Sequence, residues 1–88
     1  MTLGPRRIRL GRRADRELRR LDPPMQRRVV AALDRLAADD PSLDVIKLTE
    51  QDMWRVRVGD WRILFDRDDA AHEIRVGRIV PRGRAYDR

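Results

Sequence analysis

Three arginines on two neighbouring segments are the residues whose type and spacing best suit chemistry on an anion. Arg55 and Arg57 alternate with apolar residues ahead of a Gly59-Asp60 dipeptide, and Arg62 follows it closely. A guanidinium group is a planar fork of N–H donors that matches the oxygens of a phosphate. Whether the three groups act together depends on the backbone that carries them.

Residues 54–65 read as a two-stranded antiparallel hairpin. A two-residue loop between alternating segments is typical of a primed turn, because Gly59 supplies the positive φ that the turn needs. Side chains alternate across a strand, so the three arginines are expected on one face and the apolar residues on the other. The expected register pairs Val58 with Trp61, Arg57 with Arg62, Val56 with Ile63, Arg55 with Leu64, and Trp54 with Phe65.

Two interpretations of the face that bears the arginines remain open. Like charges directly opposite each other destabilise a sheet, so the pair of Arg57 and Arg62 carries a cost unless an anion offsets it. A polyanionic ligand would do so. The alternative is that this is simply the solvated face, because antiparallel sheets commonly bury one face and expose the other.

Composition narrows the class of protein. The chain has 88 residues, which is enough for a single domain over residues 1–88, and a formal charge of +6 with a pI of about 11.3. That balance favours nucleic acid, the ribosome, an acidic protein or an anionic membrane surface as partner. Without cysteine there are no disulfides, thiolate metal sites or thiol catalysis. No segment reads as a signal peptide or reaches membrane-spanning length, so a cytoplasmic location is expected.

The remaining segments predict an α+β domain. Residues 6–10 form a short strand, residues 12–21 a helix, and a second helix follows Asp22, a candidate N-cap, until Asp39-Asp40-Pro41-Ser42 ends it. Residues 43–48 are expected to form an irregular connection. Residues 74–80 predict a further strand whose alternation is imperfect, with Pro81 ending regular pairing. The predicted architecture is a short N-terminal strand, a two-helix hairpin and a three-stranded antiparallel meander, with the helices packed on one face of the sheet.

The element order and three motifs resemble the RelE/ParE superfamily of toxins from type II toxin–antitoxin systems. The motifs are Lys47-Leu48, the segment from Trp54 to Phe65, and the closing Pro81-Arg82-Gly83-Arg84-Ala85-Tyr86. The resemblance covers essentially the whole chain and is strongest to the RelE-like messenger-RNA interferases. Such toxins enter the ribosomal A site and cut the bound messenger, using the 2′-hydroxyl to attack the adjacent phosphate.

The resemblance also implies roles for individual residues. Clustered guanidinium groups would stabilise the charge of the transition state. By position, the catalytic set is Arg57, Arg62, Arg82 and Tyr86, and the RNA-binding set is Arg55, Arg57, Arg62, Arg78 and Arg84. No cofactor is implied. The acidic residues show no spacing typical of a metal site, so a metal-independent mechanism is the simpler hypothesis.

One departure from the family concerns the general base. Some members have lysines on the first hairpin strand, where this chain has Arg55 and Arg57, and arginine stays protonated at physiological pH. Proton abstraction would then fall to Tyr86 or to ribosomal RNA. Tyr86 could instead stack on a base or be a packed aromatic residue at the sheet edge, and Arg82 could stabilise the phosphate or protonate the leaving group through a water.

Two other functions share the predicted fold. One is a ParE-like inhibitor of DNA gyrase without catalytic activity, and the other is an inactive relative that binds only nucleic acid or a protein. The resemblance implies a cognate antitoxin as partner, besides the ribosome and messenger RNA, and no membrane partner. The basic surface predicts that the neutralising segment of the antitoxin is acidic or amphipathic.

Overall fold

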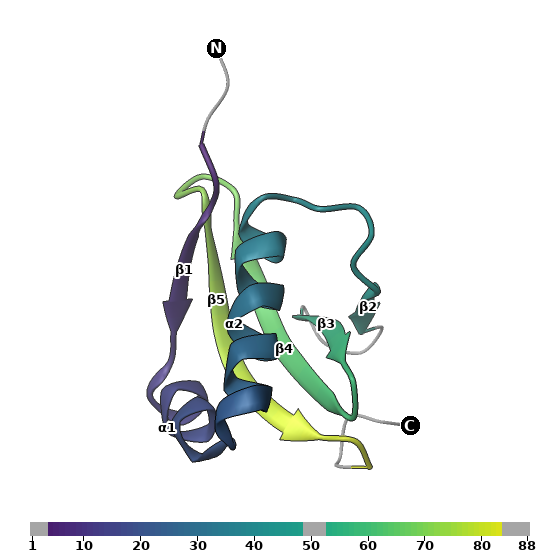
Figure 1. The fold of residues 1–88 in the computed structure, drawn as a ribbon. Coiled ribbons are helices and arrows are strands. Elements are labelled where there is room, and N and C mark those ends of the chain that lie inside the picture. The colour runs from purple at the N-terminus through teal and green to yellow at the C-terminus, as the bar shows by residue number, and fades with distance from the viewer. Residues whose placement is uncertain (1–3, 49–52, 84–88) are drawn as a thin grey trace.

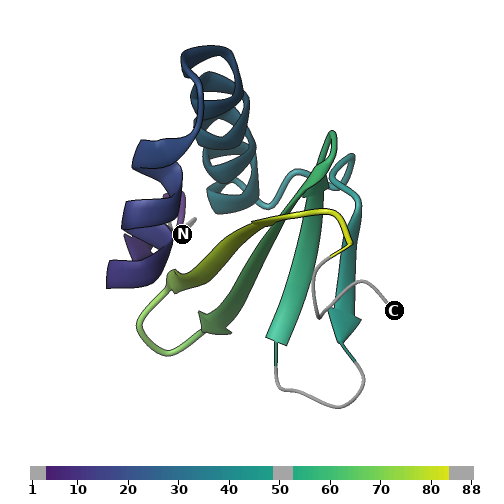
Figure 2. The same cartoon turned by 90° about the horizontal axis from the view of Figure 1, so that it is seen from below.

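The computed structural model describes residues 4–48 and 53–83, which form a five-stranded sheet and two helices (Figure 1). The sheet has the order β1-β5-β4-β3-β2, with β1 parallel to β5 and the other neighbours antiparallel. Seen from below, both helices lie together on one side of the sheet (Figure 2), so the predicted α+β architecture is confirmed. The elements are β1 (Arg7–Leu10), α1 (Arg12–Arg20), α2 (Pro23–Ala37), β2 (Val45–Leu48), β3 (Met53–Val58), β4 (Trp61–Asp68) and β5 (Glu73–Pro81).

The hairpin of β3 and β4 has the predicted register at all five pairs. Gly59 has a φ of 58°, whereas Asp60 is not among the described residues with positive φ, which is the pattern of a type II′ turn. The predicted apolar face is also confirmed. It contributes Val56, Val58, Ile63 and Phe65 to the core, and Trp54 and Trp61 pack against that core.

The predicted irregular connection at residues 43–48 is wrong for its second half. Residues Val45–Leu48 form β2, which pairs with β3 through Val45↔Val56 and three further pairs. Val45 and Ile46 are both apolar, so the sequence of this segment does not alternate, although in the structure Val45 packs on the core and Ile46 is 46% exposed. Pairing with the outer edge of β3 makes it a strand, because both backbones gain hydrogen-bond partners there.

A β-bulge explains the imperfect alternation of the last strand. Leu64 pairs with Arg78 and Phe65 with Val76, so Gly77 is the extra residue on β5. The bulge reverses the alternation, which lets both Val76 and Ile79 face the core. Without it, one half of β5 would turn its apolar residues away from the helices.

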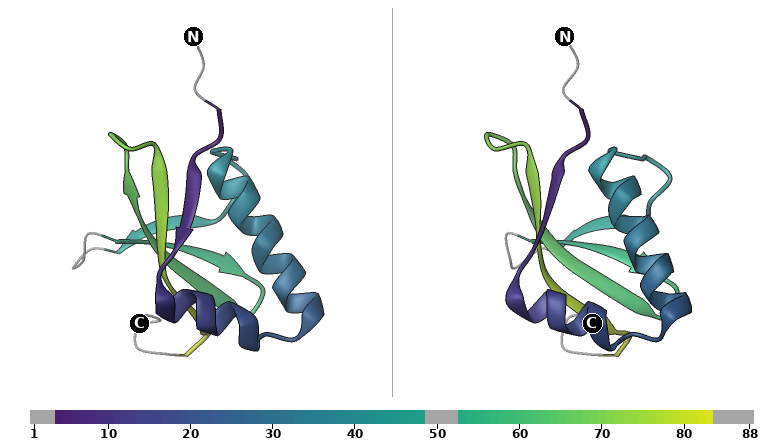
Figure 3. Two further views of the ribbon diagram at one scale, coloured as in Figure 1. Left: turned by 90° about the vertical axis from the view of Figure 1, so that its left-hand side faces the viewer. Right: turned by 60° about the vertical axis from the view of Figure 1, so that its left-hand side comes forward.

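Helix α2 lies across one face of the sheet (Figure 3), where its apolar residues Val29, Ala32, Leu33 and Leu36 enter the core. Asp22 occupies the predicted N-cap position, although its side chain makes no capping hydrogen bond. Helix α1 begins where β1 stops pairing with β5 at Val76. It covers the edge of β5 beyond that point, and Glu17 Oε1 accepts a hydrogen bond from the Ile79 backbone N–H at 2.8 Å. An exposed strand edge is thereby closed by a helix.

Candidate functional site

The sheet face opposite α2 carries the predicted site residues Arg55, Arg57 and Arg62 and is called the arginine face. At the hairpin-turn end, Arg57 and Arg62 lie opposite each other, as predicted. The middle row holds Arg55 opposite Leu64, and the far end holds Arg75 opposite Arg9 of β1. Leu64 and Val80 on this face are nonetheless buried, with 0% and 3% exposure, so the face is not a uniformly solvated surface.

Arg57 and Arg62 differ sharply in their surroundings. The Arg57 side chain is 53% exposed and forms an ion pair with Asp44. Arg62 is only 6% exposed, and its Nη1 donates to the carbonyl oxygens of Trp61 at 3.1 Å and Gly59 at 3.4 Å. The cost of the like-charge pair is therefore offset within the protein, by a carboxylate on one side and carbonyl dipoles on the other.

Arg82, which the sequence alone did not place, lies beside the hairpin turn. Its backbone N–H donates to the Asp60 carbonyl at 2.7 Å. The prediction that Pro81 ends regular pairing is therefore wrong, because Pro81 pairs with Trp61 and the next residue still donates across to the hairpin turn. Arg82 is exposed. This contact brings Arg82 to the same end of the sheet as Arg57 and Arg62.

A fourth arginine at the turn was missed from the sequence. The Arg28 guanidinium of α2 lies so close to Gly59 that a Cβ added there would meet its Nη2 at 3.0 Å. Nothing in the helical periodicity of α2 sets Arg28 apart from its neighbours; only the tertiary contact does. The set Arg28, Arg57, Arg62 and Arg82 around the Gly59-Asp60 turn is called the turn cluster.

The remaining predicted site residues are Arg55, Arg78, Arg84 and Tyr86. Arg55 is half-buried in the middle of the arginine face. Arg78 is directed to α1, where its guanidinium pairs with Glu17 at 3.0 Å and its side chain is 24% exposed. Tyr86 and Arg84 lie outside the described residues.

The described ranges 4–48 and 53–83 hold no group of three histidine, aspartate or glutamate side chains arranged to bind a metal ion. None of the helices in those ranges is long and apolar enough to cross a membrane. The turn cluster combines Arg57, Arg62 and Arg82 with Arg28, which approaches the turn from α2. It is suited to binding and stabilising phosphate charge.

Comparison with known proteins assigns the chain to a family. The sequence model described as "ParE toxin of type II toxin-antitoxin system, parDE" matches residues 8–86. No curated protein sequence matches the chain.

Solved structures agree with the family match. The archaeal RelE–RelB complex from Pyrococcus horikoshii has a chain 29% identical, with a TM-score of 0.77 over 91% of this chain and 98% of that one. The RelBE2 complex from Mycobacterium tuberculosis is similar at 22% identity, with a TM-score of 0.74 over 92% and 95% of the two chains. The isolated RelE toxin of E. coli shares the fold at 18% identity, with a TM-score of 0.73 over 91% and 87%. The chain belongs to the RelE/ParE superfamily and is a toxin of a type II toxin–antitoxin system.

Proposed function

We propose that this toxin is a ribosome-dependent endoribonuclease that cuts messenger RNA in the A site. The turn cluster is the observation that supports the proposal, because several guanidinium groups around one turn suit stabilisation of the negative charge that develops on a phosphate in the transition state. The likeness to RelE structures supports it as well. In the reaction, the RNA 2′-oxygen attacks the adjacent phosphorus. The bond from phosphorus to the 5′-oxygen of the next nucleotide then breaks. It leaves a 2′,3′-cyclic phosphate and a 5′-hydroxyl.

The arginines would divide the work according to their surroundings. Arg62 is buried and bonded to carbonyl oxygens, so it supplies a fixed positive charge that needs no reorganisation during the reaction. Among the described residues the exposed Arg57 side chain forms a solvated ion pair with Asp44, which is worth about 0–1 kcal/mol, so it can exchange Asp44 for a phosphate at little cost. Arg82 is exposed beside the same turn and would contact the phosphate from β5.

The proton from the 2′-hydroxyl needs another acceptor, because a guanidinium group is not a base. A phenol loses its proton more readily when positive charges are near it. We assign this acceptor role to Tyr86 from its place in the sequence. The proton gained by the 5′-oxygen would come from water next to Arg82. In this proposal the arginines stabilise charge and Tyr86 accepts the proton of the 2′-hydroxyl.

The proposal is tested by inducing the protein in cells and mapping messenger 5′ ends by primer extension. Wild type is compared with Arg82→Ala, Tyr86→Phe and a control, Arg16→Ala, which removes an exposed charge of α1. Cuts within translated codons are expected for wild type and the control and should be lost in both site variants. Growth arrest without such cuts would refute the ribonuclease.

Inhibition of DNA gyrase is the second candidate function. It is favoured by the family description itself, which names the ParE toxins. Purified toxin added to a gyrase supercoiling assay distinguishes the two. Loss of supercoiling with intact messenger would favour the gyrase target.

A cognate antitoxin is the proposed partner. RelE relatives are seen in complex with RelB antitoxins, and the charge of +6 on this chain favours an acidic or amphipathic neutralising segment. Such a segment would compete with RNA for the arginine face. The ribosome is the second proposed partner.

A further inference from the structure

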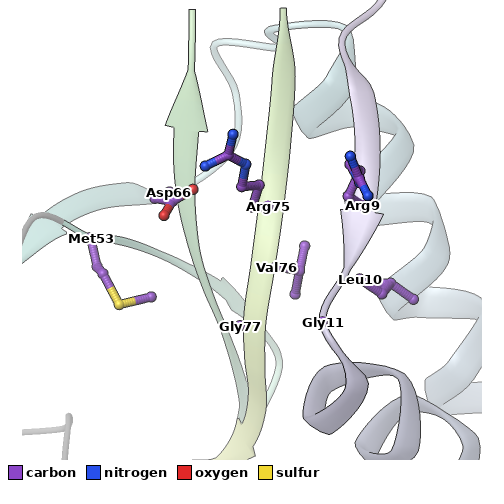
Figure 4. Close-up of a pocket in the computed structure, with 8 residues that line it drawn as sticks. All are labelled: Arg9, Leu10, Gly11, Met53, Asp66, Arg75, Val76 and Gly77. Atoms are coloured by element: carbon purple, nitrogen blue, oxygen red, sulfur yellow. The ribbon is translucent and has the colours of Figure 1, made fainter. Parts of the chain in front are cut away.

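A pocket of about 470 Å³ opens on the arginine face at the end away from the turn cluster. Figure 4 shows Asp66, Arg75 and Arg9 in a row across β4, β5 and β1, with Met53 and Gly77 below them. The volume falls in the range of pockets that hold small organic ligands. Asp66 is four residues from Arg62 on the same face of β4, which places it roughly 13 Å from the turn cluster at about 3.3 Å per residue.

The backbone of Gly77 lines the floor of the pocket, because this residue has no side chain to fill it. A Cβ at this position would meet Met53 Cε at 3.7 Å and the Leu64 carbonyl oxygen at 3.9 Å, which are ordinary contacts. Gly77 is also not among the described glycines with positive φ. Neither steric crowding nor backbone conformation therefore requires glycine. What its lack of a side chain provides is a flat surface beside the thioether of Met53.

Asp66 brings an unused hydrogen-bond acceptor to this surface. Its Oδ1 is buried and has no hydrogen-bond partner among the residues that the structure describes. Asp66 lines the pocket, so a ligand that donates to its carboxylate adds a hydrogen bond that no described residue gives to Oδ1. The carboxylate torsion has two-fold symmetry, and rotation can turn either oxygen toward the pocket.

The two arginines of the pocket are not equally available. Arg75 is held by Asp68 at 2.7 Å and by Glu73 at 3.2 Å. The Arg9 side chain is 65% exposed, and its nearest approach to Glu73 is 3.9 Å. Arg9 is thus the cation that can turn to a phosphate without breaking a close ion pair.

We propose that this pocket is a nucleobase subsite for the same RNA strand that the turn cluster would cut, an inference that rests on the proposed function. The base lies on Gly77 beside Met53, its exocyclic amino group donates to Asp66, and its phosphate meets Arg9. Asp and Glu accept from the amino group of cytosine, whereas uracil has none. The pocket therefore selects a base that carries an amino group over uracil.

The test uses binding alone, so it does not depend on cleavage. CMP and UMP are titrated into ¹⁵N-labelled toxin, and the amide signals of Gly77 and Gly11 at the pocket are followed. CMP is expected to shift them and to bind about tenfold more tightly than UMP, the lower part of the range for one good base contact. Asp66→Asn should remove this preference. Gly77→Ala, whose Cβ makes only ordinary contacts, fills part of the pocket floor and should reduce the shift at Gly11 while the remaining spectrum stays dispersed.

Shifts confined to the turn cluster, no shifts at all, or equal binding of CMP and UMP would each overturn the subsite. A failed ribonuclease assay with intact CMP binding at Gly77 would refute the proposed function and not the pocket. RNA cleavage by a protein whose pocket binds neither CMP nor UMP would refute the subsite and leave the proposed function standing. Arg16→Ala serves as the charge-matched control for Arg9→Ala, which should weaken CMP binding.

Discussion

At the scale of single residues, burial separates arginines that the sequence makes look alike. Arg57 and Arg62 face each other in the hairpin, yet the side chain of Arg57 is 53% exposed and Arg62 is 6% exposed. Alternation placed both on the correct face, but it carries no information about how far a side chain folds back. Arg28 shows the same limit, since its contact with Gly59 depends on the packing of α2 against the hairpin.

Truncating these two arginines should affect stability differently. Arg57→Ala is expected to change the free energy of unfolding by no more than about 0.5 kcal/mol, as for an exposed site. Arg62→Ala should cost about 1–3 kcal/mol, because the carbonyl oxygens of Gly59 and Trp61 lose a donor. Urea unfolding measures both, and each variant removes one positive charge. Equal losses would contradict the buried position of Arg62.

Asp40, after α2, provides a pH-dependent check. The Arg35 side chain, together with the Ser42 backbone and hydroxyl, lowers the pKa of Asp40 to about 2. A lowered pKa in the folded state stabilises the protein above the ordinary value of about 3.9, and this contribution is lost as pH falls toward 2. A ¹³C NMR titration should give the low pKa in wild type and a higher one in Arg35→Ala. An unchanged pKa in that variant would show that Arg35 is not the main cause.

At the scale of elements, local sequence patterns predicted those helices and strands whose formation depends on nearby residues. The hairpin, both helices and the last strand follow from turn chemistry and periodicity, and the structure confirms them. Strand β2 could not be predicted this way, because an edge strand of four residues depends on its neighbour more than on alternation. The bulge at Gly77 was visible only as an irregularity, and its cause required the register of β4 against β5.

Glu17 joins α1 to the edge of β5, which gives a prediction at this scale. Glu17→Ala should destabilise the fold by about 1–3 kcal/mol, because the Ile79 N–H loses its acceptor and Arg78 its partner. Glu17→Gln keeps an acceptor oxygen and should recover part of the loss. The control on the same helix is Asp15→Ala, whose exposed pair with Arg19 is worth about 0.5 kcal/mol or less. Thermal or urea unfolding ranks the three, and a loss in Asp15→Ala as large as in Glu17→Ala would argue against the edge contact.

At the scale of the whole molecule, the arginine face presents positive charge on the side of the sheet that α2 does not cover. We expect RNA, the proposed substrate, to bind there. RNA binding should weaken steeply with salt, with a slope of about −0.7 for each phosphate contact on a single strand. Arg57→Ala should reduce that slope by about one contact, whereas Arg16→Ala on α1 should leave it nearly unchanged. Fluorescence anisotropy of a labelled RNA across a salt series measures the slopes. Equal slopes for the two variants would show that the charge acts without a defined site.

The most direct test of RNA cleavage at the turn cluster uses purified components. Toxin is added to ribosomes that hold a defined messenger with an empty A site, and the messenger is analysed for cuts and for 2′,3′-cyclic phosphate ends. The wild type and Arg16→Ala should cut in the A-site codon, and Arg82→Ala should be slower by at least about tenfold, the effect of losing roughly 1.4 kcal/mol of transition-state stabilisation. An intact messenger with wild-type toxin, or full activity in Arg82→Ala, would contradict the account.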